Sequence, residues 1–205
     1  MKLFNLALVT ALAITSGSAF AQTAPTAPTA APTAPTATPT AAGGDSIVVL
    51  AKHTEAKPDD PVKVNFTKFK VTKATFDPKK IDGSKATIEI DATSLKSGID
   101  KRDAHLNTAD FLDTAKNATI TIDIDGVKKK ADKTYNANAT VKFRGVTKKY
   151  PVTFDVVDTT ADTVHVKGET TIQRTDFKVG KDPKDPKAGV QNDLTVQLDL
   201  HIKKV

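Results

Sequence analysis

The sequence predicts an all-β domain of eight antiparallel strands that begins near residue 45. Three observations support this class. Apolar and polar residues alternate with a period of two through most of the chain after residue 44, as in strands with one dry and one wet face. Turn signals containing Gly, Asp or Pro separate these runs. The stretch 101–112 alone departs from the pattern, because its apolar residues fall at helical spacing.

Residues 1–21 have the pattern of a cleavable signal peptide. Lys2 gives a positive start, residues 6–14 form a short apolar run, and residues 19–21 make a small-x-small cleavage site. The apolar run is too short for a transmembrane helix. We therefore expect an exported mature chain starting at Gln22. The chain has no cysteine, so neither disulfides nor a lipid-modified cysteine are expected.

Residues 22–44 form a linker rich in Thr, Ala and Pro, without a charged side chain. Proline recurs there every three or four residues, and such a composition predicts an extended, disordered segment. Its role is open between a spacer that holds the domain off a surface and a passive tail. Residues 45–205 are then expected to form one domain.

The strands differ in how regular their alternation is. Ser46–His53 and Val62–Phe76 are the less regular pair. In the second of these, the apolar positions switch parity between Phe66 and Phe69, which indicates a bulge or sharp bend. The six regular strands lie at residues 86–93, 118–125, 137–143, 150–156, 164–172 and 194–203.

Turn signals connect these strands. Asp82-Gly83 and Asp125-Gly126 predict hairpin turns, and Gly145 predicts a tight connection with a positive φ. A longer polar loop is expected at residues 180–189. Such a set of strands either closes into a barrel or folds as a two-sheet sandwich.

The expected interior is also open between two states. Small inward-facing residues leave room for a ligand in an eight-stranded barrel, whereas long Phe, Ile and Leu side chains would fill the same space. The small inward-facing residues are Ala86, Ala92, Ala118, Ala137, Ala139 and Gly168.

The helical stretch carries most of the candidate chemistry. Asp100 is placed to cap its first turn, and Arg102, Asp103 and His105 crowd together after it. Asp103 and His105 are two residues apart on a helix and point to different sides, which argues against an acid–base pair. The four histidines lack metal-ligand spacing, and no nucleophile elbow or phosphate loop occurs. We expect no enzyme activity, no bound metal and no cofactor.

The charge pattern limits the partners. The formal net charge is +6, with Lys and Asp mixed along the strands and 5% aromatic residues. Nucleic-acid binders instead concentrate positive charge on one face with aromatics among it. Nucleic-acid binding is therefore not expected, and attraction to an anionic head group or membrane surface fits better. His165 and His201 fall on outward faces and are expected to be solvated, as are the turn lysines 128–130.

Four motifs in order resemble those of the YceI-like family. Residues 101–111 contain Arg-Asp-Ala-His-Leu and then Ala-Asp-Phe, similar to the family's Arg-Asp-x-His-Leu…Asp-Phe signature. Residues 143–148 resemble its strand-Gly-Val-Thr-Lys turn, and residues 172–177 its Asn/Gln-Arg-x-Asp-Phe motif. Residues 190–203 resemble its closing strand. In one departure, Leu112 stands where the family has a second Phe.

This resemblance implies a lipocalin-like β-barrel, exported to the periplasm, that binds a long isoprenoid or similar lipid and has no catalytic residues. Some relatives are associated with envelope stress response, and some form homodimers. The expected function is lipid transport: a carrier or scavenger of a prenyl quinone, a polyprenyl chain or a similar amphiphile. The alternative is a non-carrier envelope interaction or stress domain with a self-filled core.

Two groups of residues are the candidates for this function. Arg102, Asp103, Asp110, Arg174 and Asp176 either contact a lipid head group at the barrel mouth or form ion pairs that tie the helical stretch to the barrel. Leu106 and Phe111 are expected to anchor that stretch by burial and also to touch ligand. The apolar residues expected to line the interior are Phe66, Phe69, Ile88, Ile90, Leu106, Phe111, Ile120, Ile122, Val141, Phe143, Phe154, Ile172 and Phe177.

Overall fold

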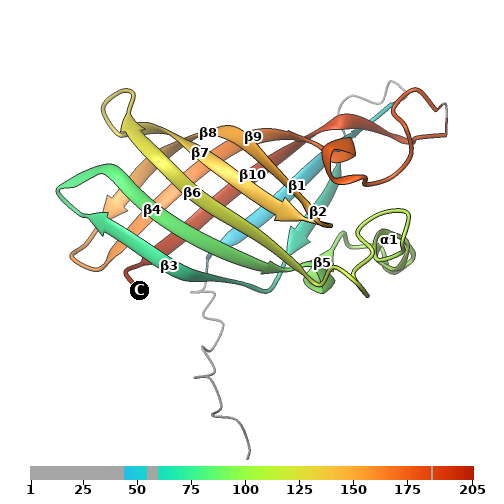
Figure 1. Ribbon diagram of the computed structural model, residues 1–205, viewed down its shortest axis with the longest axis horizontal. Coiled ribbons are helices and arrows are strands. Elements are labelled where there is room, and N and C mark those ends of the chain that lie inside the picture. Colours follow the sequence, from blue (N-terminus) through green and yellow to red (C-terminus); the bar gives the residue numbers. More distant parts are fainter. Residues whose placement is uncertain (1–43, 55–59, 186) are drawn as a thin grey trace, which may run out of the picture. The chain divides into compact units, whose positions relative to one another are not determined.

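The computed structural model describes residues 44–54, 60–185 and 187–205. The expected signal peptide and all but the last residue of the expected linker lie outside these ranges. The described chain is a curled, antiparallel sheet of ten strands with short helical segments at one end (Figure 1). The strands are β1 (Ser46–His53), β2 (Val62–Phe66), β3 (Phe69–Asp77), β4 (Lys80–Asp91), β5 (Leu95–Lys96), β6 (Thr119–Lys129), β7 (Thr134–Phe143), β8 (Val146–Thr159), β9 (Thr163–Gln173) and β10 (Val190–Lys203).

The all-β class is confirmed, but the predicted count of eight strands is wrong. The expected strand 62–76 breaks at residues 67–68 into β2 and β3, which confirms the bend predicted from its change of parity. The two-residue strand β5 pairs with the end of β2 and is too short to show alternation. The helical segments are η1 (Ala92–Ser94), α1 (Asp100–Leu106) and η2 (Arg174–Phe177).

The bend at residues 67–68 makes the sheet a barrel and not a sandwich. The strand order is β3-β4-β6-β7-β8-β9-β10-β1-β2-β5, so β2 and β3 lie near opposite edges. Only two residues separate them in the chain, and the edges must therefore meet there. At the other end of β3, the backbone N–H of Val205 donates to the carbonyl of Ala74 at 3.3 Å, which joins the chain end after β10 to β3.

Both Asp-Gly dipeptides were expected to form hairpin turns, and both predictions are wrong. Asp82-Gly83 lies inside β4 and Asp125-Gly126 inside β6, each beside a register shift. The glycines have φ values of 80° and 63°. A β-bulge and a tight turn both use such positive φ angles, so the dipeptide alone does not separate them. The connection at Gly145 is confirmed, since β8 begins one residue after it and its φ is 72°.

The barrel has two chemically different ends (Figure 1). The hairpin end, at the left of the figure, consists of the turns at 78–79, 130–133 and 160–162 together with the C-terminal residues 203–205. The insert end, at the right, carries α1, η2 and the segments that follow them. Within the described residues, no helix combines the length and apolar character needed to cross a bilayer.

Small residues on the inner face have the expected position with one exception. Ala92 and Ala137 are buried, and Ala86, Ala139 and Gly168 line cavities inside the barrel. Ala118 is exposed and precedes β6, so its expected inward position is wrong. The Ala118 carbonyl accepts a hydrogen bond from the backbone of Ala92 at 2.8 Å, which places it in the connection from the insert.

Gly168 is required by close packing of β8 against β9. A Cβ atom there would lie 2.9 Å from Cβ of Phe154 and 3.2 Å from the carbonyl oxygen of Thr153. Gly168→Ala should therefore lower the free energy of unfolding by about 1–3 kcal/mol, measured by urea denaturation. Glu169→Ala, the next position and exposed, is the control and should change it by about 0.5 kcal/mol or less. Equal losses would contradict the close approach.

Candidate functional site

The barrel interior contains two adjoining apolar cavities. The hairpin-side cavity has a volume of about 70 Å³ and is bounded by residues such as Phe76, Ile81 and Val164. The insert-side cavity has a volume of about 80 Å³ and is bounded by residues such as Ile47 and Phe66. Both are lined by Ile124, Val152 and Leu198, so they are separated by little more than these side chains.

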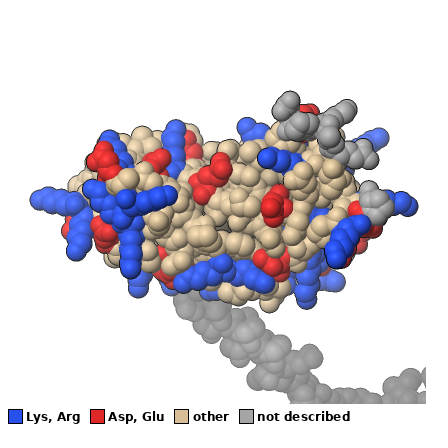
Figure 2. All heavy atoms as spheres, turned by 90° about the horizontal axis from the view of Figure 1, so that it is seen from above, with Lys and Arg blue, Asp and Glu red and all other residues tan. Residues whose placement is uncertain are grey.

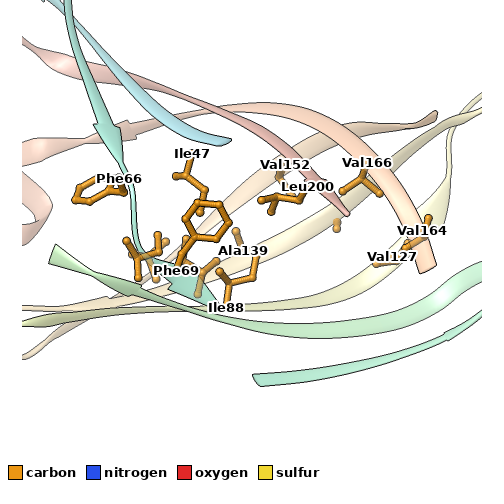
Figure 3. Close-up of a cluster of buried hydrophobic side chains, with 14 of the residues drawn as sticks. Ile47, Phe66, Phe69, Ile88, Val127, Ala139, Val152, Val164, Val166 and Leu200 are labelled. Carbon is orange, nitrogen blue, oxygen red and sulfur yellow. The ribbon is translucent and has the colours of Figure 1, made fainter. Parts of the chain in front are cut away.

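The interior is nearly filled by its own side chains. Figure 3 shows buried residues from many strands meeting along the barrel, with Phe66 toward one side and Val127 toward the other. Ile47, Ile88 and Leu200 are at most 2% exposed. Each cavity is about half the ~150 Å³ that holds one benzene molecule. A long aliphatic chain thus fits only if lining side chains change rotamer.

The structure places most of the predicted lining residues at the cavities. Phe69, Phe143 and Phe177 are buried in the core but do not line either cavity. Leu106 packs against the core from α1, together with Leu112. Contact with a ligand remains a prediction for all of them. The cavity-lining members are Phe66, Ile88, Ile90, Ile120, Ile122, Val141, Phe154 and Ile172.

Phe111 lies outside the core and is half-buried. Its ring stands edge-on to that of His105, with centroids 4.7 Å apart. A Cβ on Gly180 would lie 3.4 Å from the Phe111 ring. Phe111 therefore fills the space between α1 and the segment after η2, and the leucines of the insert make the contact with the core.

Several lining residues were not among the predicted candidates. Period-two alternation, continued through β1, β8, β9 and β10, would have identified most of them. Phe154 on β8 and Ile172 on β9 were candidates, but their inward-facing neighbours on the same strands were not carried into the list. They include Ile47, Val49, Val152, Val166, Val196, Leu198 and Leu200.

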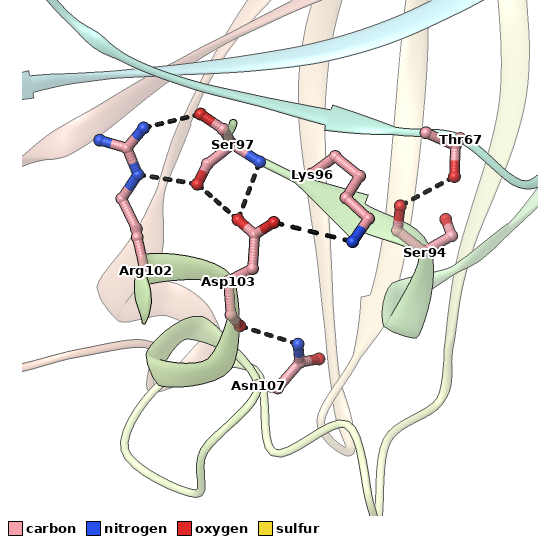
Figure 4. A network of polar contacts seen from close by, with 7 residues as sticks. All are labelled: Thr67, Ser94, Lys96, Ser97, Arg102, Asp103 and Asn107. Atoms are coloured by element: carbon pink, nitrogen blue, oxygen red, sulfur yellow. Dashed lines mark hydrogen bonds and ion pairs between the residues drawn. The ribbon is translucent and has the colours of Figure 1, made fainter. Parts of the chain in front are cut away.

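A polar network joins α1 to the segment after β5 (Figure 4). Arg102 donates from Nε to the hydroxyl of Ser97 at 2.8 Å and from Nη2 to the Ser97 carbonyl at 2.7 Å. The backbone N–H and the hydroxyl of Ser97 both donate to the carboxylate of Asp103, which is 7% exposed. These hydrogen bonds from Ser97 hold the pKa of Asp103 below its ordinary value, although burial opposes them.

Asp100 does not cap this helix. The N-cap is Ile99, without a side-chain cap, and Asp100 is the first helical residue. The bonds from Ser97 to Asp103, in the first turn, hold the start of the helix instead.

Arg174 is the most buried charged residue described, at 3% exposure. Its guanidinium donates to four backbone carbonyls, those of Val179, Lys181, Val190 and Gln191. Because five N–H groups in a planar fork reach several acceptors at once, Arg174 holds the segment after η2 against the start of β10.

Arg144 makes a structural contact at the insert end that sequence analysis missed. It stands at φ 49° in the turn between β7 and β8, and it donates to the carbonyls of Ala109, Phe111 and Lys178. The backbone N–H of Gly180 also donates to the carbonyl of Asp110 at 2.7 Å. Arg144 thus ties the insert to the segment after η2. Its place as the second residue of the resembling motif at 143–148, beside Gly145, was the available signal.

Asp176 is held by two groups of β8. The Tyr150 hydroxyl donates to it at 2.7 Å, and Nζ of Lys148 lies 3.1 Å away. The bond from Tyr150 and then that from Lys148 lower the pKa of Asp176, while burial and Asp176 raise the pKa of Tyr150.

No ion pair joins Arg102 or Asp110 to Arg174 or Asp176 in the described ranges. The side chains of Arg102, Asp103, Arg174 and Asp176 are thus engaged by the protein itself, which supports the structural role for these four, whereas Asp110 takes part through its backbone carbonyl.

The two outward-facing histidines, on β9 and β10, were predicted to be solvated, but both make specific contacts. His165 and His201 stack with ring centroids 3.9 Å apart. His165 lies 2.6 Å from the carboxylate of Asp199, and His201 lies 2.7 Å from that of Asp45. Across the described part of the chain, no group of three or more His, Asp or Glu residues is arranged to hold a metal ion.

Comparisons with known proteins agree with this architecture. A family model for the YceI-like domain matches residues 42–202. The chain is 36% identical over 61 residues to a UPF0312 protein of Azotobacter vinelandii. It is 41% identical over 59 residues to protein YceI of Escherichia coli O6:H1. These alignments cover 30% and 29% of this chain and only about a third of the relatives, 32% and 31%.

Two solved structures show the same fold. BcnA of Burkholderia cenocepacia superposes with a TM-score of 0.68 at 19% identity, over 78% of this chain and 96% of that one. A polyisoprenoid binding domain from Saccharophagus degradans, implicated in plant cell wall breakdown, superposes with a TM-score of 0.58 at 15% identity. That match covers 78% of this chain and 94% of the other.

The network around Ser97 predicts a pH-dependent contribution to stability. Because the pKa of Asp103 is lower in the folded chain, its carboxylate stabilises the fold at neutral pH. That contribution is lost as the pH falls below about 4. Asp103→Asn should therefore be less stable than the wild type at pH 7, with a difference that shrinks in acid, measured by denaturant unfolding across pH. Asp100→Asn, the same change on an exposed neighbour, should show no such trend; a matching trend there would contradict the assignment.

The Arg174 cluster predicts that lysine cannot replace arginine there. Lys has no planar fork, so Arg174→Lys should leave buried carbonyls unsatisfied and lower the free energy of unfolding by about 2 kcal/mol or more. Lys184→Arg, on the exposed neighbouring segment, serves as the control and should change it by about 0.5 kcal/mol or less. Thermal and urea unfolding check both, and a neutral Arg174→Lys would show that the four bonds contribute little.

Proposed function

The chain belongs to the YceI-like family, and from this premise we propose that it is an exported carrier or scavenger that binds an isoprenoid-type lipid inside the barrel. The observation that carries the proposal is the pair of adjoining cavities, with an almost wholly apolar lining, along one barrel interior. A prenyl quinone, a polyprenyl chain or a similar amphiphile has a long apolar chain, which would lie along this interior once the lining side chains move. One structural neighbour, from Saccharophagus degradans, is a polyisoprenoid binding domain, which supports this class.

The physical basis is non-directional burial. Each methylene removed from water contributes about 0.8 kcal/mol, so a chain of many carbons binds tightly without polar contacts. Lining residues with several rotatable bonds, such as Leu198 between the two cavities, must move to admit it. Carrier function in this proposal therefore includes an expansion of the interior. Export follows from the signal-peptide pattern of residues 1–21, and a periplasmic location is part of the proposal, as is the absence of catalysis.

The alternative is a non-carrier interaction or stress domain with a self-filled core. The observation that favours it is the small size of the cavities, about 70 and 80 Å³. The two candidates differ in one measurable property, the uptake of a long lipid chain.

Uptake can be tested on the full-length protein. We expect organic extraction of protein from its native source, followed by mass spectrometry, to release an isoprenoid lipid, and delipidated protein to take up a prenyl quinone from detergent solution. Ala139→Phe would fill the insert-side cavity from an inward position and should weaken uptake by about tenfold or more. Ala86→Phe makes the same test in the hairpin-side cavity if the first variant does not fold.

Thr140→Phe is the size-matched control, because position 140 is adjacent to Ala139 on β7 and belongs to the opposite face. Its uptake should equal that of the wild type. Absence of lipid from native material together with no uptake of prenyl quinone would support the self-filled alternative.

A further inference from the structure

The hairpin end of the barrel carries a cluster of exposed lysines. Figure 2 shows basic side chains (blue) at the left-hand end of the barrel, the hairpin end of Figure 1, with acidic side chains (red) among them. In the described part of the chain, none of these lysines lies within ion-pair distance of a carboxylate. We call this set the hairpin lysines: Lys79, Lys80, Lys128, Lys129, Lys130, Lys133, Lys203 and Lys204.

The carboxylates at the same end, which include those of exposed Asp132, Asp158 and Asp162, are fewer than the eight lysines and offset this charge only in part. Asp77 accepts a hydrogen bond from the backbone of Lys79 at 2.9 Å, and Asp82 accepts one from the backbone of Lys129 at 2.8 Å. These aspartates therefore organise the turns. The lysine side chains beside them remain directed to solvent as a positively charged rim.

The rim surrounds one end of the apolar interior. The hairpin-side cavity is bounded there by Phe76 and Ile81 and reaches the surface beside half-exposed Ser84 and exposed Lys85. Nζ of Lys204 lies over the ring of Phe76, 5.1 Å from its centroid, so a cation and the apolar wall are in direct contact. An apolar mouth ringed by cations matches an amphiphile with an anionic head group.

The opposite end is closed by contacts already described. Leu106 and Leu112 pack onto the core there, and Phe177 is 3% exposed. The guanidinium groups of Arg144 and Arg174 donate hydrogen bonds to backbone carbonyls of the segments that cover this end. Opening it would break several buried hydrogen bonds at once, which makes it the less accessible route for a lipid.

We propose that the hairpin end docks on the surface of an anionic phospholipid bilayer, and that lipid passes between bilayer and barrel through this end. The passage rests on the proposed carrier function, whereas the docking does not. Attraction to an anionic bilayer grows with each Lys or Arg near its surface, so the eight lysines on this one end supply a substantial attraction. A nucleic acid is the less suitable polyanion, because the aromatic residues beside these turns, Phe76 and Tyr135, are buried and offer no stacking surface.

Docking is tested by co-sedimentation of the full chain with vesicles of phosphatidylglycerol and phosphatidylcholine, against vesicles of phosphatidylcholine alone. The wild type should bind the anionic vesicles only, and less at high salt. The triple variant Lys128→Gln, Lys129→Gln, Lys130→Gln should bind about tenfold more weakly or worse. The matched control, Lys101→Gln, Lys178→Gln, Lys184→Gln, removes the same charge from exposed positions at the insert end and should bind almost as the wild type does.

Equal losses in the two triple variants, or equal binding to neutral vesicles, would overturn the docking. The docking would also be overturned if the wild type bound duplex DNA but no vesicles, and the hairpin variant lost the DNA binding. Uptake of prenyl quinone from detergent solution, measured in parallel, separates this proposal from the carrier function. Vesicle binding specific to the hairpin lysines without any lipid uptake would support docking and refute passage. If the hairpin variant takes up prenyl quinone from vesicles at the wild-type rate, passage through this end is refuted, whatever its vesicle binding.

Discussion

The bend at Thr67 and Lys68 is the constraint on which the rest of the structure depends. It lets one continuous stretch of chain pair with β1 on one side and with β4 on the other. The bend is held from η1, because the backbone of Lys68 donates to the hydroxyl of Ser94 at 3.0 Å, and the Thr67 hydroxyl donates to the Ser94 carbonyl at 3.0 Å. Without this closure the sheet would keep two open edges and an exposed apolar face.

Closure creates an interior, and how completely its own side chains fill it separates the proposed lipid carrier from the self-filled alternative. Alanines and Gly168 alternate along the inner wall with Ile, Leu and Phe, which leaves two small cavities instead of one large one. Under the proposed carrier function, the packing that stabilises the barrel must yield to a lipid chain, so stability and capacity are opposed. Native interiors are close-packed, and each displaced side chain costs contact energy. A long ligand can offset that cost because its own burial grows with every methylene.

The two ends of the barrel use positive charge in different ways. At the insert end, the guanidinium groups of Arg102, Arg144 and Arg174 are bound to hydroxyls and carbonyls of the protein. At the hairpin end, ammonium groups remain in water around the mouth of the hairpin-side cavity. This division follows from chemistry, since a planar fork satisfies several carbonyls at once and a flexible, strongly hydrated ammonium group favours the surface.

Local patterns in the sequence were enough for the approximate positions of the longer strands, but not for β5 or the bounds of β4 and β6. They were also enough for the bend between Phe66 and Phe69, the tight turn at Gly145 and the resemblance to a family. Each depends on residues close together in the chain, where alternation and positive φ have direct physical meaning. The tertiary structure decided whether Asp82-Gly83 was a turn or a bulge, since that depends on the partner strand. It also placed Phe111 outside the core and brought three backbone carbonyls within hydrogen-bond distance of the Arg144 guanidinium. These acceptors lie more than thirty residues away in sequence, and no local pattern records which distant groups the closed barrel brings together.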